Sequence, residues 1–247
     1  MSTWFLVALA LLLAGPLFTL ALGRASVGGD WRTASQRTTG LAPDPSEHRE
    51  PVVQVYASRA FGWRGAFSDH TWVAVKPEGA ARYTRYEVIG WYASGGRSVI
   101  SISSQRAPDA EWYGAPPRLL RDLRGAEAAA VIARLPQALA AYPWPAEYRV
   151  WPGPNSNTFV AYLGRAIPEL RLAMPSTAVG KDYVSLREIV GPSSSHTGVA
   201  VSLYGLVGVT AAWDEGLEVN VLGLVAGVDV RHPALKLPGI GRVPGDG

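Results

Sequence analysis

The chain has 247 residues, of which 48% are hydrophobic, so it is long enough to bury the core of one globular domain. Its formal net charge is only +3, and 20 of its 23 cations are arginines scattered along the chain without a basic run. This pattern argues against a nucleic-acid-binding surface, which needs clustered positive charge. Because cysteine is absent, disulfides, thiolate metal sites and cysteine nucleophiles are excluded.

The first 23 residues, MSTWFLVALALLLAGPLFTLALG, carry no charged side chain. An apolar run of about 20 residues is long enough to cross the ~30 Å core of a bilayer, whereas the apolar core of a cleaved signal peptide has about 7–15 residues. The run therefore favours a retained transmembrane anchor over residues 1–23, with a cleaved signal segment as the alternative. Arg24, Arg32 and Arg37 favour a cytosolic body by the positive-inside rule. Anchors at the extreme amino end usually export the rest of the chain, and on balance we expect an extracytoplasmic body.

Residues 24–50 are polar and rich in Gly, Pro, Ser and Thr, which predicts a flexible linker before a single globular domain over residues 51–247. Alternating or β-rich runs predict strands in the first half of this domain. They cover residues 52–56, 71–75, 82–93 and 95–105. Gly95 and Gly96 supply the positive φ angles of a tight turn between the last two strands.

A helical tract follows at residues 125–143, where Ile132, Leu135 and Leu139 are spaced to form one buried face. Pro136 is expected to kink this helix or divide it in two. A second helix is predicted over residues 157–167. The valine- and glycine-rich tract 198–230 predicts a buried β-hairpin around the turn WDEG, because charged residues interrupt any membrane-spanning run. These elements predict an α+β domain with a mostly antiparallel sheet and helices packed on it.

Three small polar residues, Asn155, Ser156 and Asn157, stand at the mouth of the second helix, in VWPGPNSNTF. Either they only cap the helix, or one of them is a nucleophile in the field of the helix end. A helix end stabilises negative charge by about 0.3–1 kcal/mol, up to about 2, which is too little to ionise a serine hydroxyl. Ser156 can therefore act as a nucleophile only if a neighbouring base removes its proton.

His70 is the candidate base, because it stands in SDHTW at the opening of an apolar strand. Its alternative interpretation is a hydrogen-bonded histidine at the edge of the core. His48, His196 and His232 are expected in the linker, a loop and a turn. No three or four ligands converge in the sequence, and no nucleotide-binding or metal-protease motif is present, so no metal and no cofactor is predicted.

Three segments, VYASRAFGWRGAFSDHTWVAVKP, YRVWPGPNSNTF and LKLPGIGR, occur in this order behind the apolar amino end. They resemble the bacterial family catalogued as domain of unknown function 3750, and the resemblance runs from Val52 to Arg242. It implies a bacterial protein, and the apolar amino end adds the expectation of an envelope protein that crosses the inner membrane once. The family name implies no activity.

A more distant similarity concerns HTW at His70 and NSNTF at Asn155 to Phe159. A histidine opening a strand, followed much later by Asn-Cys-Asn-x-Phe at a helix start, is typical of circularly permuted papain-like enzymes of the lecithin retinol acyltransferase and PPPDE types. The resemblance implies a papain-like permuted arrangement and acyl transfer or amide hydrolysis. This chain has Ser156 where those enzymes have cysteine. Glu87 is a candidate third, orienting group, with a solvated strand residue as the alternative.

Two hypotheses follow. In the first, the protein is a serine-type hydrolase or acyltransferase in which Ser156 and His70 react and Asn155 or Asn157 helps to bind the oxyanion. In the second, it is a non-catalytic envelope module that holds a peptide, glycan or lipid in the same cleft. The candidate aromatic rim of this cleft consists of Trp63, Trp72, Trp91 and Trp151, of which Trp72 and Trp151 are the predicted substrate contacts.

Overall fold

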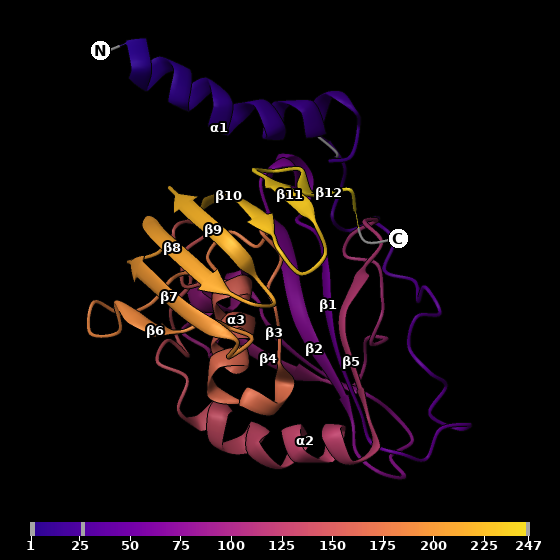
Figure 1. The fold of residues 1–247 in the computed structure, drawn as a ribbon. Coiled ribbons are helices and arrows are strands. Elements are labelled where there is room, and N and C mark those ends of the chain that lie inside the picture. Colours follow the sequence, from indigo (N-terminus) through magenta and orange to yellow (C-terminus); the bar gives the residue numbers. More distant parts are fainter. Residues whose placement is uncertain (1–2, 26–27, 246–247) are drawn as a thin grey trace.

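Two antiparallel sheets form the framework of the computed structural model, which describes residues 3–25 and 28–245 (Figure 1). The first sheet has the strand order β4-β3-β2-β1-β5. Its strands are β1 (Val52–Arg59), β2 (Asp69–Lys76), β3 (Thr84–Val88), β4 (Ile100–Ser103) and β5 (Arg118–Arg124). Together with two α-helices packed on this sheet, the arrangement confirms the predicted α+β class and the single domain with mostly antiparallel strands.

Strands β1 and β2 lie at the centre of the first sheet and are buried on both faces. On one face, Val53 and Val55 join the core beneath the helices. On the other face, Val52 and Tyr56 join a smaller cluster that includes Trp112. The period-2 alternation of the sequence therefore separates two apolar clusters here, instead of an apolar face from a solvated one.

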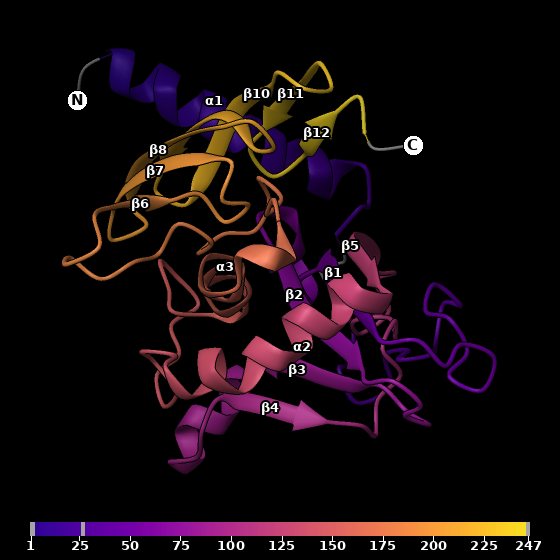
Figure 2. The same cartoon turned by 60° about the horizontal axis from the view of Figure 1, so that its bottom comes forward.

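Helices α2 (Gly125–Ala140) and α3 (Ser156–Ala166) cover one face of this sheet, where α2 packs on β1 and β5 and α3 on β2 and β3. Both views place α3 between the first sheet and the strands of the second (Figures 1 and 2). The predicted division of the helix at Pro136 is wrong, because α2 continues through this residue. Pro136 lies on the exposed side, and Val131, Leu135 and Ala138 keep the buried stripe continuous on both sides of the proline.

The predicted strand 82–93 is shorter than expected, because β3 ends at Val88 and a 3-10 helix, η2 (Gly90–Gly95), follows. The chain then passes through Gly96, which has the left-handed conformation (φ 65°), before β4 begins. A longer connection therefore replaces the expected tight turn. It places Trp91 beside the cavity of the candidate site.

The second sheet is a meander in which every strand pairs with its neighbours in sequence, in the order β12-β11-β10-β9-β8-β7-β6. Its strands are β6 (Val190–Pro192), β7 (Gly198–Leu203), β8 (Val207–Ala212), β9 (Gly216–Val221), β10 (Leu224–Asp229), β11 (Ala234–Leu237) and β12 (Gly241–Val243). The predicted hairpin around WDEG is confirmed as β8 and β9, but its predicted burial is wrong, because Val209 and Val219 are each 45% exposed. Two further 3-10 helices are η1 (Gly62–Ala66) and η3 (Pro168–Leu170).

Helix α1 (Thr3–Ala21) packs its second half against the domain, close to β11 and β12 (Figure 1). Gly15 and Pro16 are buried, and the Thr19 hydroxyl donates to the carbonyl of Gly239 over 3.2 Å. Over residues 3–25 and 28–245, no helix combines the length and apolarity needed to cross a bilayer. The predicted transmembrane helix, and with it the single-pass inner-membrane localisation, is therefore wrong. Met1 and Ser2, the start of the predicted anchor, lie outside the described residues.

Candidate functional site

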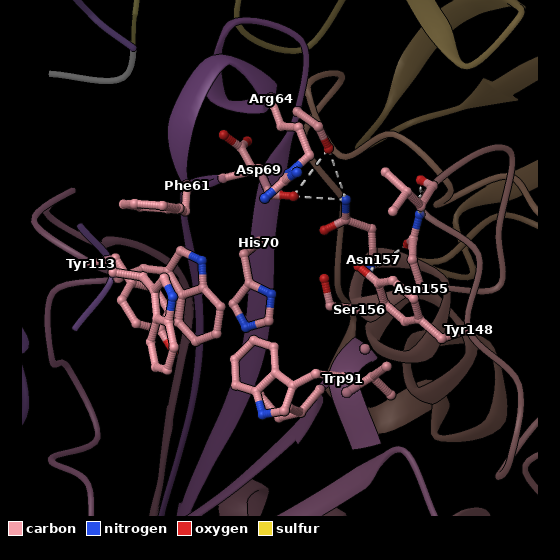
Figure 3. Close-up of a pocket in the computed structure, with 18 residues that line it drawn as sticks. Phe61, Arg64, Asp69, His70, Trp91, Tyr113, Tyr148, Asn155, Ser156 and Asn157 are labelled. Atoms are coloured by element: carbon pink, nitrogen blue, oxygen red, sulfur yellow. Dashed lines mark hydrogen bonds between the residues drawn. The ribbon is translucent and has the colours of Figure 1, made fainter. Parts of the chain in front are cut away.

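A cavity of about 720 Å³ lies where the start of β2 meets the start of α3. His70 and Ser156 both line it, although their exposed fractions are only 7% and 5%, so they form its floor. Its apolar wall is formed by Trp31, Phe61, Trp91, Trp112, Tyr113 and Tyr148. Figure 3 shows the His70 ring and the Ser156 hydroxyl facing one another across this space.

Asn157 fixes the position of Ser156 relative to His70. Its side-chain amide donates to the carbonyl of Asp69 over 2.9 Å and accepts from the hydroxyl of Thr71 over 3.0 Å. Asp69 and Thr71 are the two chain neighbours of His70, so one buried side chain holds both sides of the histidine. The first turn of α3 is thereby docked on the start of β2, which brings together residues 86 positions apart.

Asn155, rather than Ser156, caps helix α3. Its side-chain oxygen accepts from the amides of Asn157 and Thr158 over 3.0 and 3.1 Å, and the Asn155 amide donates to the Thr158 hydroxyl over 3.1 Å. Gly180 permits this arrangement, because a β-carbon there would lie 2.4 Å from the Asn155 side chain. Of the three small polar residues expected to cap the helix, Asn155 is therefore the cap and Ser156 is not. Ser156 is the first helical residue, and within the described residues its hydroxyl makes no hydrogen bond.

Replacement of Asn155 by alanine is expected to destabilise the protein by about 1–2 kcal/mol, because the cap of α3 is lost. The matched variant Ser156→Ala is expected to change the free energy of unfolding by less than about 0.5 kcal/mol, because no folded-state hydrogen bond is removed. Urea unfolding of both variants measures the difference. A Ser156→Ala variant as unstable as Asn155→Ala would contradict this assignment of the cap.

Glu87 lies on β3 beside His70, where its carboxylate oxygen is 3.1 Å from Nε2 of the imidazole. Arg85 donates to the same oxygen over 2.9 Å, and Arg106 lies 3.8 Å from the other oxygen. Only 4% of Glu87 is exposed, so the alternative of a solvated strand residue is wrong.

The charge states of this pair are set by burial and neighbours. Burial opposes the ionisation of Glu87, but the hydrogen bond with His70 and the guanidinium of Arg85 hold the pKa of Glu87 at about 2. Burial lowers the pKa of His70 below its usual value and outweighs the influence of Glu87. At neutral pH, therefore, an ionised carboxylate faces a neutral imidazole.

This charge state determines the tautomer of His70. An ionised carboxylate only accepts hydrogen bonds, so Nε2 of His70 must carry the proton that is donated to Glu87. Nδ1 then has a free lone pair, on the edge of the ring that faces Ser156 (Figure 3). Within the described residues no hydrogen bond joins Nδ1 to the serine hydroxyl. A base aimed at the hydroxyl in this way can accept its proton when a bound substrate closes the geometry.

The indole of Trp112 stacks on the His70 ring, with centroids 3.5 Å apart and an angle of 11° between the planes. The stack fixes the plane of the imidazole, and the π-face of the indole stabilises the cation that forms when the ring accepts a proton. Trp112 lies in a loop before β5, where no alternating pattern marks it. Sequence reasoning therefore missed it, together with Phe61, Tyr113 and Tyr148. The adjacent aromatic residues Trp112 and Tyr113, followed by Gly114, were the one sequence feature that could have indicated an aromatic loop at the site.

The predicted substrate contacts Asn155 and Asn157 lie at the cavity, but their side-chain amides are already engaged. Asn155 Nδ2 donates to the carbonyls of Val150 and Val179, and Asn157 Nδ2 donates to Val179 as well as to Asp69. An oxyanion would therefore be met by backbone at this helix start. Ser156 is the first residue of α3, so its amide N–H has no intrahelical acceptor, and within the described residues it makes no other hydrogen bond.

The predicted contacts Trp72 and Trp151 lie away from the cavity. Trp72 is 0% exposed, stacks on Tyr56 and donates to the carbonyl of Pro108, so it cannot touch a ligand. Trp151 is half exposed but donates to the carbonyl of Leu222 in the second sheet. The predictions that Trp72 and Trp151 form part of the aromatic rim and contact the substrate are therefore wrong. Of the four rim candidates, Trp91 lines the cavity.

No curated protein and no solved structure matches the chain. The model of the family described as "Protein of unknown function (DUF3750)" matches residues 50–183, which is more than half of the 247 residues. The matched region includes β1 to β5, both sheet-covering helices, and the three groups His70, Glu87 and Ser156. The chain therefore belongs to the DUF3750 family.

Proposed function

We propose that the protein is a serine-type hydrolase or acyltransferase in which Ser156 is the nucleophile, His70 the general base and Glu87 the group that orients the base. The observation that carries this proposal is the buried hydrogen bond between Glu87 and Nε2 of His70, 3.1 Å long. It directs the free Nδ1 of His70 into the cavity that contains the Ser156 hydroxyl. The same three roles make up the nucleophile, base and orienter of serine hydrolases.

The proposed reaction begins when the Ser156 oxygen attacks the carbonyl carbon of an ester or amide while its proton passes to Nδ1 of His70. The backbone amide of Ser156, at the positive end of α3, donates to the oxyanion of the tetrahedral intermediate. Collapse of the intermediate breaks the bond to the leaving group, which receives the proton from His70. Water then releases the acyl group in a hydrolase, and an alcohol or amine receives it in an acyltransferase.

The shape of the cavity supports an acyl donor with an apolar or aromatic part. Six aromatic side chains form its wall, and Gly90 allows the ring of Tyr148 to approach, because a β-carbon there would lie 2.5 Å from that ring. Such a wall favours a lipid acyl chain or an apolar peptide side chain over a glycan. A permuted papain-like arrangement is part of the proposal, supported by the order of a histidine at a strand start and a nucleophile at a later helix start.

A fluorophosphonate probe tests the chemistry. We expect the probe to modify one site, identified as Ser156 by peptide mass spectrometry. The rate of modification should fall at least about 10³-fold in Ser156→Ala and in His70→Ala. The nucleophile and the base act together, so the loss of either one removes most of the reactivity. The control Ser104→Ala, an exposed serine at the end of β4, should react like the wild type.

A non-catalytic binding module is the second candidate, favoured by the lack of a Ser156–His70 hydrogen bond within the described residues. In that case the folded wild-type protein would not react with the probe. It would still bind an apolar peptide or an acyl chain in the cavity, measured by quenching of its tryptophan fluorescence. In that case, replacement of Trp112 by alanine would weaken ligand binding, whereas Ser156→Ala would leave the binding affinity unchanged.

A further inference from the structure

The outward face of the second sheet consists of three cross-strand rows of apolar side chains. The central row joins β6 to β10 through directly opposed residues, Val190, Val201, Val209, Val219 and Ala226. The flanking rows are formed by Pro192, Val199, Ala211, Leu217, Val228, Leu235 and Val243 on one side and by Leu203, Val207, Val221 and Leu224 on the other. No charged or hydrogen-bonding side chain stands in any of these positions.

This outward apolar face is exposed. Val209 and Val219, near its middle, are each 45% exposed, and Val199 and Val207 exceed 50%. A monomeric soluble protein rarely exposes an apolar patch of more than a few hundred Å². The meander in Figure 2 lies at the periphery of the molecule, with α3 beneath its other face.

The inward face of the same sheet is polar, which reverses the usual pattern of a sheet on a core. Thr210, Glu218 and Lys236 lie on this face and are all buried. Glu218 binds both Lys236 and Lys181, which comes from the segment after α3. These buried ion pairs determine which face of the meander points inward, so the apolar rows are left outward by the fold itself.

We propose that a second copy of this chain covers the outward face, so that two meanders pack face to face about a two-fold axis. The sheet has four strands of six residues and three shorter strands. With about 4.8 Å between strands and about 3.4 Å per residue along each strand, the area of one face of the sheet is about 550 Å² per copy. If the whole sheet is covered, two copies would bury about 1,100 Å², which exceeds the roughly 1,000 Å² that a specific interface needs.

The uniform chemistry of the face is the reason to choose a second copy as its occupant. Stacked sheets pack about 10 Å apart through interdigitating aliphatic side chains, and both partners must supply an apolar face. A two-fold interface brings the same surface from each subunit, so this chain supplies both faces without charge repulsion.

Sedimentation equilibrium of the full chain over a concentration series tests the proposal. We expect the wild type to dimerise with a dissociation constant in the micromolar range or below. The variant Val219→Lys, in the middle of the central strand β9, should weaken dimerisation at least about 100-fold, because each copy would bury a lysine. The matched control Ile102→Lys carries the same change on exposed β4 and should dimerise like the wild type. Circular dichroism should show all three proteins equally folded.

Because the chain has no cysteine, Val219→Cys introduces a single thiol. A bismaleimide should cross-link this variant into covalent dimers and leave Ile102→Cys uncross-linked. A wild type that stays monomeric at about 100 µM would overturn the proposal, as would a Val219→Lys variant that dimerises normally. A monomeric wild type that sediments with phosphatidylcholine vesicles, while Val219→Lys does not, would also overturn it and identify a lipid surface as the occupant.

Discussion

Replacement of Glu87 by glutamine is expected to slow the reaction of Ser156 with a fluorophosphonate by about 10³–10⁴-fold. The glutamine amide can donate a hydrogen bond to Nε2 of His70, which the carboxylate cannot do. The imidazole would then carry its proton on Nδ1, the nitrogen that faces Ser156, and could no longer accept the serine proton. The side chain keeps its size, so the loss would come from the tautomer of His70 and not from a cavity.

The second-order rate constant of labelling measures this effect, with circular dichroism as a check that the variant is folded. Arg106→Gln is the matched control, because it removes a 3.8 Å ion pair with the same carboxylate and leaves the bond between Glu87 and His70 in place. We expect Arg106→Gln to change the rate of labelling by less than about 10-fold, because the loss of this charge would shift the pKa of Glu87 without removing the hydrogen bond to His70. A folded Glu87→Gln variant that reacts like the wild type would exclude Glu87 as the orienting group.

Replacement of Glu218 by alanine is expected to destabilise the protein by about 3–5 kcal/mol, the effect of removing one partner from a buried ion pair. Glu218 accepts from Lys181 over 2.7 Å and from Lys236 over 2.6 Å, and all three side chains are buried. The nearby positive charges hold the pKa of the Glu218 carboxyl below its usual value, although burial acts against them. Without the carboxylate, the buried ammonium group of Lys236 would lose its ion pair, and Lys181 would keep only Asp182 as a partner.

Urea unfolding monitored by tryptophan fluorescence measures this loss. The control Glu188→Ala removes an exposed carboxylate from the segment before β6 and is expected to change the free energy of unfolding by less than about 0.5 kcal/mol. Equal effects of the two substitutions would show that the ion pairs do not hold the meander to the rest of the domain.

The sequence predicted the elements whose pattern is local. The alternating residues 52–56 and 71–75 lie in β1 and β2, and the polar triplet 155–157 lies at the start of α3, as expected. Pairing His70 with Ser156 required a long-range contact, which no local pattern predicts. The two residues were chosen because HTW and NSNTF resemble motifs of papain-like enzymes, a resemblance that stays a proposal, and the structure places both residues on one cavity. Their catalytic roles stay a prediction.

Other features depend on information that a local pattern does not contain. When both faces of a sheet are buried, period-2 alternation does not show which face lines a cavity. Trp72 was therefore predicted to contact a ligand, but its side chain is buried in the core. Hydrophobicity at the amino end cannot show that Gly15 and Thr19 pack on the domain. The valine-rich carboxyl-terminal tract predicts a buried hairpin, yet its valines point outward, because the polar alternate positions find their partners at Lys181 and Asp182.

Residues 179–182 connect the start of α3, where Ser156 lies, to the second sheet. The carbonyls of Val179 and Gly180 hold the side chains of Asn157 and Thr158 at the start of α3. The next two residues, Lys181 and Asp182, are bound to β9 and β7. Four consecutive residues thus form a brace between the meander and the proposed nucleophile, Ser156. If a second copy binds the meander as proposed, its binding would act on this brace and would change the position of Ser156 relative to His70.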